Sequence, residues 1–218
     1  MYNTESFVKQ LTEKYPPHQG NKTHFDIKNI ENFESELGTE LPSDFYDFLL
    51  AYGSGSFNDY FYVWHPFTEG GADEFFQNNK QAEENYKFLE NSLDASWRVD
   101  CCFSDNKLIT LNGDKKFTET LRTEQIDAHT RSKIMALGNH YPYHFFPEKD
   151  GMVYWGRTDD DDFFLRIRDE KNSIIMYNDG YYEFDMGITE FIYEYLTGTI
   201  RLPMMHNETG WDFISYES

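Results

Sequence analysis

The most constraining feature of this chain is a run, residues 141–168, in which two aromatic-rich segments are joined by four consecutive aspartates. Residues 152–155 and 163–167 each predict a short strand, because aromatic and β-branched side chains are enriched in strands. Residues 156–162 between them have the turn chemistry expected between antiparallel strands. Four adjacent carboxylates at such a tip must stay in water or meet positive charge. The run therefore predicts a hairpin with an acidic, solvated tip.

The whole chain is strongly acidic. It has 39 acidic and 19 basic residues, so its formal net charge is −20, far beyond the magnitude of about 2–8 that serves the solubility of a small domain. Such a field repels nucleic-acid phosphates and anionic membrane surfaces, and it favours a basic protein partner. The alternative is that the acidity only suits the cytoplasm of the host.

The composition predicts a folded chain in spite of its polarity. A mean hydropathy of −0.73 is typical of chains that remain disordered. However, 18% of the residues are aromatic, with 20 Phe and 16 Tyr, and these side chains bury large areas when they pack. A length of 218 residues is most simply one domain.

Cysteine content and hydropathy indicate a cytoplasmic protein. The two cysteines, Cys101 and Cys102, are adjacent, and two thiols cannot build a disulfide framework or a four-cysteine zinc site. The first ten residues lack the pattern of a signal peptide. Apolar runs such as residues 48–52 are far shorter than the roughly 20 residues that span a bilayer.

The order of the predicted elements is typical of an α+β fold. Helices are expected over residues 26–38, 43–52, 73–92, 123–131 and 187–199. Strands are expected over residues 60–66, 99–103, 107–111, 134–137, 152–155, 163–167, 173–177, 181–184 and 211–215. Thr189 is the expected cap of the last helix, and residues 178–180 supply a tight hairpin turn.

No motif for catalysis or metal binding is apparent. His140 and His144 have a spacing that suits a metal on a helix, but Pro142 lies between them and makes a helix there improbable. The run 159–162 lacks the alternating ligands and the glycine of a calcium loop. The chain also lacks the nucleophile elbow, the phosphate-binding loop and the dinucleotide fingerprint. We therefore expect no catalytic residue, no metal and no cofactor.

Aromatic residues are the candidates for recognition. Trp64 and Trp155 lie in predicted strands, where packing in the core is the expected role. Tyrosines at positions 60, 62, 141 and 143 are more ambiguous, because a phenol group can stay in water while its ring packs. Such residues suit the edge of a protein-binding face.

Three segments together resemble the SUKH superfamily, which includes bacterial immunity proteins and a fungal regulator of cell-wall synthesis. They are IENFESELGTELPSDFYDFLLAYGSGSF, DGMVYWGRTDDDDFFLRI and GITEFIYEYLTG. The resemblance covers about residues 27–198, so residues 25–200 are the expected domain, residues 1–24 an N-terminal extension and residues 201–218 a C-terminal tail. Two departures are the acidic turn, which lacks the glycine often found there, and residues 70–135, which form an elaboration longer than the family minimum.

The resemblance implies a mainly antiparallel sheet with helices packed on one side, and a function in binding. Bacterial members look like antitoxins that neutralise a toxin, often a nuclease, whose phosphate-binding cleft is basic. No set of catalytic residues is carried over. The expected partner-binding residues are Asp159, Asp160, Asp161, Asp162, Asp169, Glu170, Tyr60, Tyr62, Tyr141 and Tyr143. The alternatives are a regulatory or scaffold domain, as in the fungal relative, and a metal-dependent hydrolase that uses His140, His144 and the aspartates.

Overall fold

Six helices and eleven strands make up the part of the chain that the computed structural model describes, residues 6–17, 27–68, 70–92, 99–104, 107–112, 120–138, 142–167, 172–178, 180–206 and 209–216. The helices are α1 (Phe7–Lys14), α2 (Ile27–Leu37), α3 (Ser43–Tyr52), α4 (Gly71–Ser92), α5 (Ala128–Lys133) and α6 (Ile188–Thr197). The strands are β1 (Gly55–Phe57), β2 (Phe61–Val63), β3 (Val99–Ser104), β4 (Lys107–Asn112), β5 (Thr120–Gln125), β6 (Ile134–Gly138), β7 (Met152–Arg157), β8 (Asp162–Arg166), β9 (Ser173–Tyr177), β10 (Tyr181–Phe184) and β11 (Phe213–Ser215).

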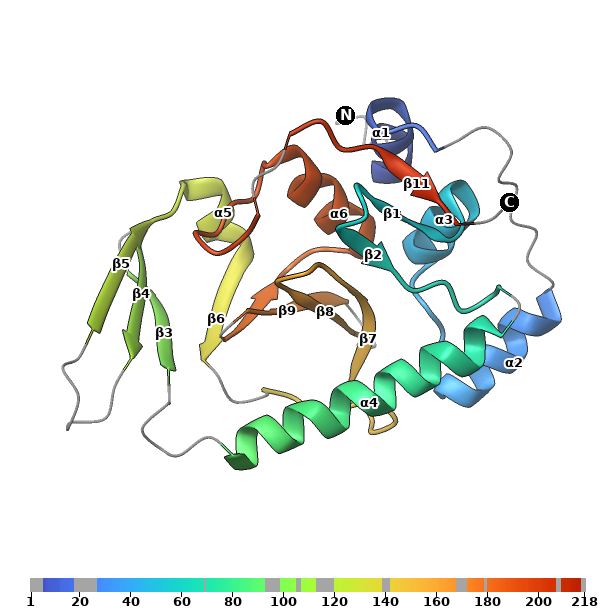
Figure 1. Cartoon of the computed structure of the whole chain (residues 1–218), viewed down its shortest axis with the longest axis horizontal. Coiled ribbons are helices and arrows are strands. Elements are labelled where there is room, and N and C mark those ends of the chain that lie inside the picture. Colours follow the sequence, from blue (N-terminus) through green and yellow to red (C-terminus); the bar gives the residue numbers. More distant parts are fainter. Residues whose placement is uncertain are drawn as a thin grey trace.

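Eight of these strands form one sheet in the order β11-β1-β2-β7-β8-β9-β10-β6 (Figure 1). Every neighbouring pair in it runs antiparallel. The aromatic run forms the predicted hairpin β7–β8, with Val153 opposite Leu165. Strands β3, β4 and β5 form a second, antiparallel sheet, and β3 lies beside β6.

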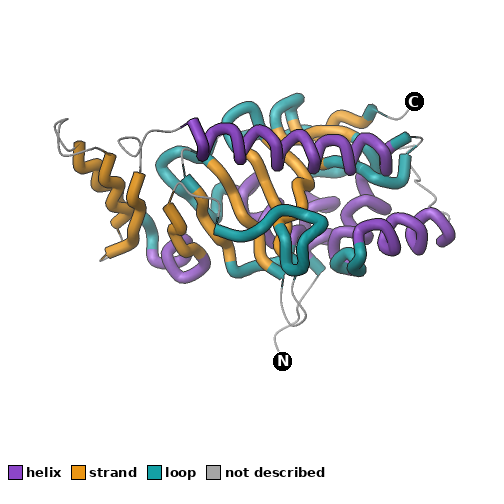
Figure 2. The backbone as a smooth tube through the Cα atoms, turned by 90° about the horizontal axis from the view of Figure 1, so that it is seen from below, coloured by secondary structure: helices purple, strands orange, loops and turns teal. Residues whose placement is uncertain are grey.

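The main sheet has apolar side chains on both faces. Successive residues of a strand point to opposite faces, so Val153 and Trp155 join the larger core cluster, whereas Met152 and Tyr154 join a smaller one. Helices α1, α2, α3 and α6 contribute to the larger cluster, as does Phe75 of α4. The expected class, α+β with a mainly antiparallel sheet and helices packed on one side, is confirmed. In addition, α4 runs along the other side of the strands (Figure 2) and adds Tyr86 to the smaller cluster.

Both predicted flanking segments pack into the main body. Leu11 of α1 is fully buried, and the Tyr15 hydroxyl donates a hydrogen bond to the Leu196 carbonyl oxygen at 2.9 Å. At the other end of the chain, the predicted strand at 211–215 is present as β11, which pairs with β1 at the edge of the sheet. Residues outside the range 25–200 therefore contribute to the core and to the sheet.

Four local predictions are wrong. The expected helix over 123–131 is divided between β5, which pairs along its length with β4, and α5, which begins after Asp127. A carboxylate oxygen of Asp127 accepts the backbone N–H of Thr130 at 2.9 Å and so caps α5. Strand β1, shortly after α3, was not predicted, and β2 is shorter than the strand predicted over 60–66.

The fourth error concerns the start of α6. The residue before the helix is Gly187, and Thr189 does not act as the cap. Instead, Asp44 Oδ2 of α3 accepts both the backbone N–H and the hydroxyl of Thr189, each at 3.1 Å. A carboxylate from another helix therefore accepts one of the backbone N–H groups that the first turn of α6 leaves without a partner inside the helix. In the described part of the chain, none of the helices has the length and hydropathy needed to cross a membrane.

Candidate functional site

The β7–β8 connection is a tight turn built around Thr158. The Thr158 N–H donates to the Asp161 carbonyl oxygen at 2.7 Å. The Thr158 hydroxyl oxygen accepts the backbone N–H of Asp161 at 2.8 Å and that of Asp160 at 3.2 Å. A threonine side chain that accepts backbone donors in this way fixes the turn without a glycine. The structure thus accounts for the absence of glycine among residues 159–162.

The four aspartates of this turn do not share one environment. Asp159 and Asp160 are exposed, as the sequence predicts. Asp161 is only 2% exposed, and Asp162 is half-buried. Asp162 opens β8, where it accepts hydrogen bonds from the hydroxyls of Tyr86 and of Tyr154, the latter at 2.7 Å. The prediction of a fully solvated tip is therefore wrong for Asp161 and Asp162.

Asp161 is buried among hydrogen-bond donors. Its Oδ1 accepts the side-chain N–H of Asn178 at 2.8 Å, and its Oδ2 accepts the hydroxyl of Thr158 at 3.1 Å. Burial raises the pKa of Asp161 to about 6, while the hydrogen bonds from Asn178 and Thr158 act in the opposite direction. This carboxylate supports the turn from within and does not present its charge on the surface.

Tyr60 connects the exposed part of the turn to the neighbouring hairpin. Its hydroxyl donates to Asp160 Oδ2 at 2.9 Å. Its ring packs against the rings of His206 and Trp211, with centroid distances of 4.7 and 5.9 Å. Burial raises the pKa of Tyr60 above its ordinary value of 10.0, so the phenol stays protonated and remains a donor to Asp160.

The β1–β2 turn adds further acidic groups beside Tyr60. Asn58 and Asp59 both have positive φ angles, 54° and 51°, as expected for the two central residues of a tight hairpin turn. Asn58 exchanges two hydrogen bonds with Asp212, at 2.9 and 2.7 Å. Asp59 Oδ1 accepts the Tyr216 hydroxyl at 3.1 Å, and both Asp59 and Asp212 are exposed.

These contacts bring three segments together in a surface that we call the acidic end. It consists of four exposed carboxylates, two half-buried tyrosines and one exposed tyrosine from the two turns and the segment around β11: Asp59, Asp159, Asp160, Asp212, Tyr60, Tyr62 and Tyr216. Arg157 borders this surface, with its guanidinium 5.7 Å from the centroid of the Tyr62 ring. Asp159, Asp160, Tyr60 and Tyr62 were predicted from the sequence, whereas Asp59, Asp212 and Tyr216 were not, because the three segments lie far apart in the chain.

The remaining predicted binding residues lie elsewhere or are not described. The Tyr143 hydroxyl donates to Glu183 Oε2 at 2.6 Å, and its ring is covered by Arg166 at 3.5 Å from the centroid. Tyr143 therefore belongs to a network on β8 and β10. Tyr141, Asp169 and Glu170 lie outside the described residues.

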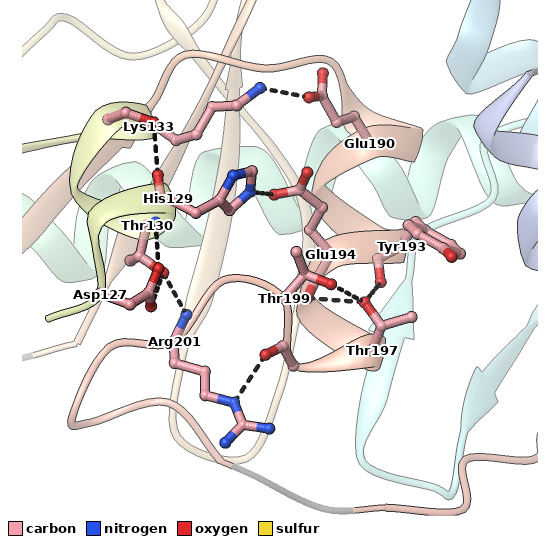
Figure 3. Close-up of polar contacts among 12 residues, drawn as sticks. Asp127, His129, Thr130, Lys133, Glu190, Tyr193, Glu194, Thr197, Thr199 and Arg201 are labelled. Atoms are coloured by element: carbon pink, nitrogen blue, oxygen red, sulfur yellow. Dashed lines mark hydrogen bonds and ion pairs between the residues drawn. The ribbon is translucent and has the colours of Figure 1, made fainter. Parts of the chain in front are cut away.

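A second polar network joins α5 to α6 (Figure 3). His129 Nε2 lies 2.9 Å from Glu194 Oε2, and Lys133 Nζ lies 2.6 Å from Glu190 Oε1. The hydrogen bond with Glu190 raises the pKa of Lys133 above its ordinary value. The backbone N–H of Arg201 donates to the Thr130 hydroxyl at 3.0 Å. Each of these contacts joins two segments, so the network holds α5 against α6 and against the segment that follows α6.

Within the described residues, no group of three or more His, Cys, Asp and Glu side chains is arranged to hold a metal ion. His140, one of the two histidines of the hydrolase alternative, lies outside these residues. His144 Nδ1 lies 3.5 Å from Glu148 Oε2, and both side chains are largely exposed. The chain matches no known family model, no characterised protein and no solved structure. The resemblance to the SUKH superfamily thus stays a prediction based on the sequence motifs.

Proposed function

We propose that this chain is a non-enzymatic immunity protein that binds and neutralises a toxin domain with a basic surface, and that the toxin is a nuclease. The acidic end is the observation that carries the proposal. It presents four exposed carboxylates, from three segments, beside three tyrosines. The net charge of −20 and the motifs that resemble the SUKH superfamily support the same reading.

The carboxylates and the tyrosines have different parts in the proposed complex. Two unit charges about 4 Å apart interact by about 4 kcal/mol at an effective dielectric constant near 20, but exposed ion pairs contribute only about 0–1 kcal/mol each. The exposed aspartates therefore act mainly on the association rate and on the choice of a basic partner. Tight binding needs aromatic anchors, for which Tyr60 and Tyr62 are placed beside the carboxylates.

A nuclease is the favoured partner on chemical grounds. An enzyme that cleaves nucleic acid must present lysines and arginines to phosphate groups. An acidic surface competes for those side chains and is attracted to them before contact. The same surface repels the nucleic acid itself.

The proposal predicts a toxin gene beside this one, and the direct test is co-expression of this chain with the toxin domain of that gene. Cells that express the toxin alone should die, and cells that also express this chain should survive. The same rate of killing with and without this chain would contradict the proposal. If substitutions in the acidic end abolish this rescue, survival of the cells depends on that surface.

The matched variants for that test reverse two charges each. In the first, Asp159→Lys is combined with Asp160→Lys. In the control, Glu31→Lys is combined with Glu36→Lys on α2, where both residues are exposed, so that the net charge changes equally. We expect the first variant to associate with the toxin at least tenfold more slowly at low salt, with a smaller difference at high salt because of screening. Equal slowing of both variants would show that only the overall charge acts.

A further inference from the structure

A cavity of about 330 Å³ lies where the end of α1, the end of α6 and the segment that leads into β11 meet. Among the described residues, its lining includes the cations Lys14 and Arg201 and no carboxylate. Four other cavities in the described part of the chain each have at least one acidic side chain in their lining. In a chain with a net charge of −20, this cavity is a local region of positive charge.

Neither cation of this cavity forms an ion pair with a carboxylate of the described residues. Arg201 Nε donates to the Gly198 carbonyl oxygen at 2.7 Å, and Figure 3 shows the Arg201 side chain extending away from α5. A guanidinium has five N–H donors, so those of the two terminal nitrogens of Arg201 remain. Lys14 Nζ lies 5.7 Å from the centroid of the Tyr15 ring, whereas Lys9 on the same helix pairs with Glu13. The cationic donors beside the cavity are therefore available to a ligand.

The acceptors around the cavity are largely used within the protein. The Tyr195 carbonyl oxygen accepts the Gly198 N–H at 3.0 Å, and the Leu196 carbonyl oxygen accepts the Tyr15 hydroxyl at 2.9 Å. In contrast, the Nε1–H of Trp211, whose ring lines the cavity, is buried and has no acceptor among the described residues. Donors thus exceed acceptors here, which favours a ligand with several acceptor oxygens.

The positions of the two cations at helix ends do not by themselves account for this arrangement. Lys14 and Arg201 complement the partial negative charge at the C-terminal ends of α1 and α6. That role requires a cation near each helix end, but it requires neither a cavity between them nor a lining without carboxylates. The helix ends oppose an anion, so the affinity of the site for an anion should be modest.

We propose that this cavity binds the phosphoryl group of a small phosphorylated molecule. The site lies outside the acidic end, and the inference does not depend on the proposed function. A phosphate monoester carries a charge of about −1.5 to −2 at neutral pH and three acceptor oxygens, which matches the two cations. The guanidinium of Arg201 can bind two of these oxygens at once. The buried rings of Tyr195 and Trp211 line the space for the rest of the molecule, and the volume is at the lower end of the range of about 300–1,000 Å³ for ligand pockets.

The first test is an NMR titration of the full chain with phenyl phosphate at pH 7.5 and constant ionic strength. The signals of the Trp211 indole N–H and of the Thr197 and Gly198 amides should shift and reach saturation, and inorganic phosphate should shift the same signals. Benzoate has the same ring but a carboxylate with a single charge, so it should bind at least threefold more weakly. Equal affinities for benzoate and phenyl phosphate would overturn the assignment of a phosphoryl group. Shifts that do not saturate, or that do not include Trp211, would overturn the site.

The second test compares two substitutions on α1 that change the net charge equally. Lys14→Gln removes a cation that lines the cavity, and Lys9→Gln removes one that does not. The dissociation constant for phenyl phosphate should rise about three- to fivefold in the first variant, the effect of one exposed ion pair, and should stay the same in the second. Equal weakening in both variants would show that only the overall charge acts, and would overturn the site.

A third variant, Arg201→Gln, should weaken the binding of phenyl phosphate about tenfold, because a charged, two-pronged contact is lost. Arg201 also donates to Gly198, so urea unfolding of this variant is needed to show that the fold is retained. If it is not, Lys14→Gln decides the outcome, since the Lys14 ammonium contacts only the Tyr15 ring among the described residues. Unchanged affinity in a folded Arg201→Gln variant would contradict the proposal.

Discussion

The buried carboxylate of Asp161 makes a quantitative prediction about folding stability. Its pKa is about 6 in the folded protein, compared with an ordinary value of 3.8. A raised pKa in an acid means that the folded state binds the proton more tightly than the unfolded state. Stability contributed by this group is therefore present at low pH and is lost as the pH rises from about 4 to about 6.

The magnitude follows from the difference between the two pKa values. A difference of about 2 units corresponds to about 3 kcal/mol at about 1.4 kcal/mol per unit. About half of that change falls between pH 5 and pH 8, which is the useful range because the isoelectric point lies near 4.6. The substitution Asp161→Asn removes the titration and keeps the shape of the side chain. We expect the free energy of unfolding of the native protein to fall by about 1.5 kcal/mol relative to that of the variant between pH 5 and pH 8.

The assay is urea denaturation of both proteins at half-unit pH steps, followed by tryptophan fluorescence. The quantity of interest is the difference between the two unfolding free energies at each pH, because the titration of the other carboxylates then cancels. Parallel curves would refute the raised pKa. Divergence in the opposite direction would show that the hydrogen bonds from Asn178 and Thr158 outweigh burial.

Three further substitutions test the packing. Asn79→Leu should lower the free energy of unfolding by about 1–3 kcal/mol, because the Asn79 side chain bonds to the N–H and the carbonyl oxygen of Tyr154. Urea unfolding measures this loss, and the control substitution Asn78→Leu should change the unfolding free energy little. Asp44→Ala should cost about 1 kcal/mol through loss of the α6 cap, measured by thermal unfolding, and no cost would contradict that role. Trp155→Ala should cost about 3–5 kcal/mol in the same assay, because the ring is fully buried, and a cost below about 1 kcal/mol would contradict its place in the core.

Local patterns in the sequence were sufficient for most of the fold. The spacing of Phe33 and Leu37 predicted α2, and the aromatic run predicted the β7–β8 hairpin. The failures occurred where partners distant in the chain decide the outcome. Strand β1 forms because Gly55 and its neighbours pair with both β2 and β11, and β11 lies about 160 residues further along. A glycine-rich segment alone does not show such pairing.

The same limit applies to the candidate site. Asp159 and Asp161 have the same side chain and lie two residues apart, yet one is exposed and the other is buried. Burial of a carboxylate is tolerated only where donors surround it. The donors to Asp161 include Asn178 and Tyr195, which are 17 and 34 residues away in the sequence. From composition alone, all four aspartates of the turn are expected on the surface. The fold is needed to show which of them are accessible to a partner.

The difference between buried and exposed carboxylates limits what the net charge of the chain indicates about binding. Glu183, Glu194 and Asp161 are all buried and accept hydrogen bonds, so their charges serve internal contacts. In the proposed complex, a basic partner can pair directly only with the exposed carboxylates, and each such pair contributes only about 0–1 kcal/mol. The arrangement of the acidic end, where exposed aspartates adjoin tyrosines that are themselves held by carboxylates, is therefore a better guide to binding than the net charge.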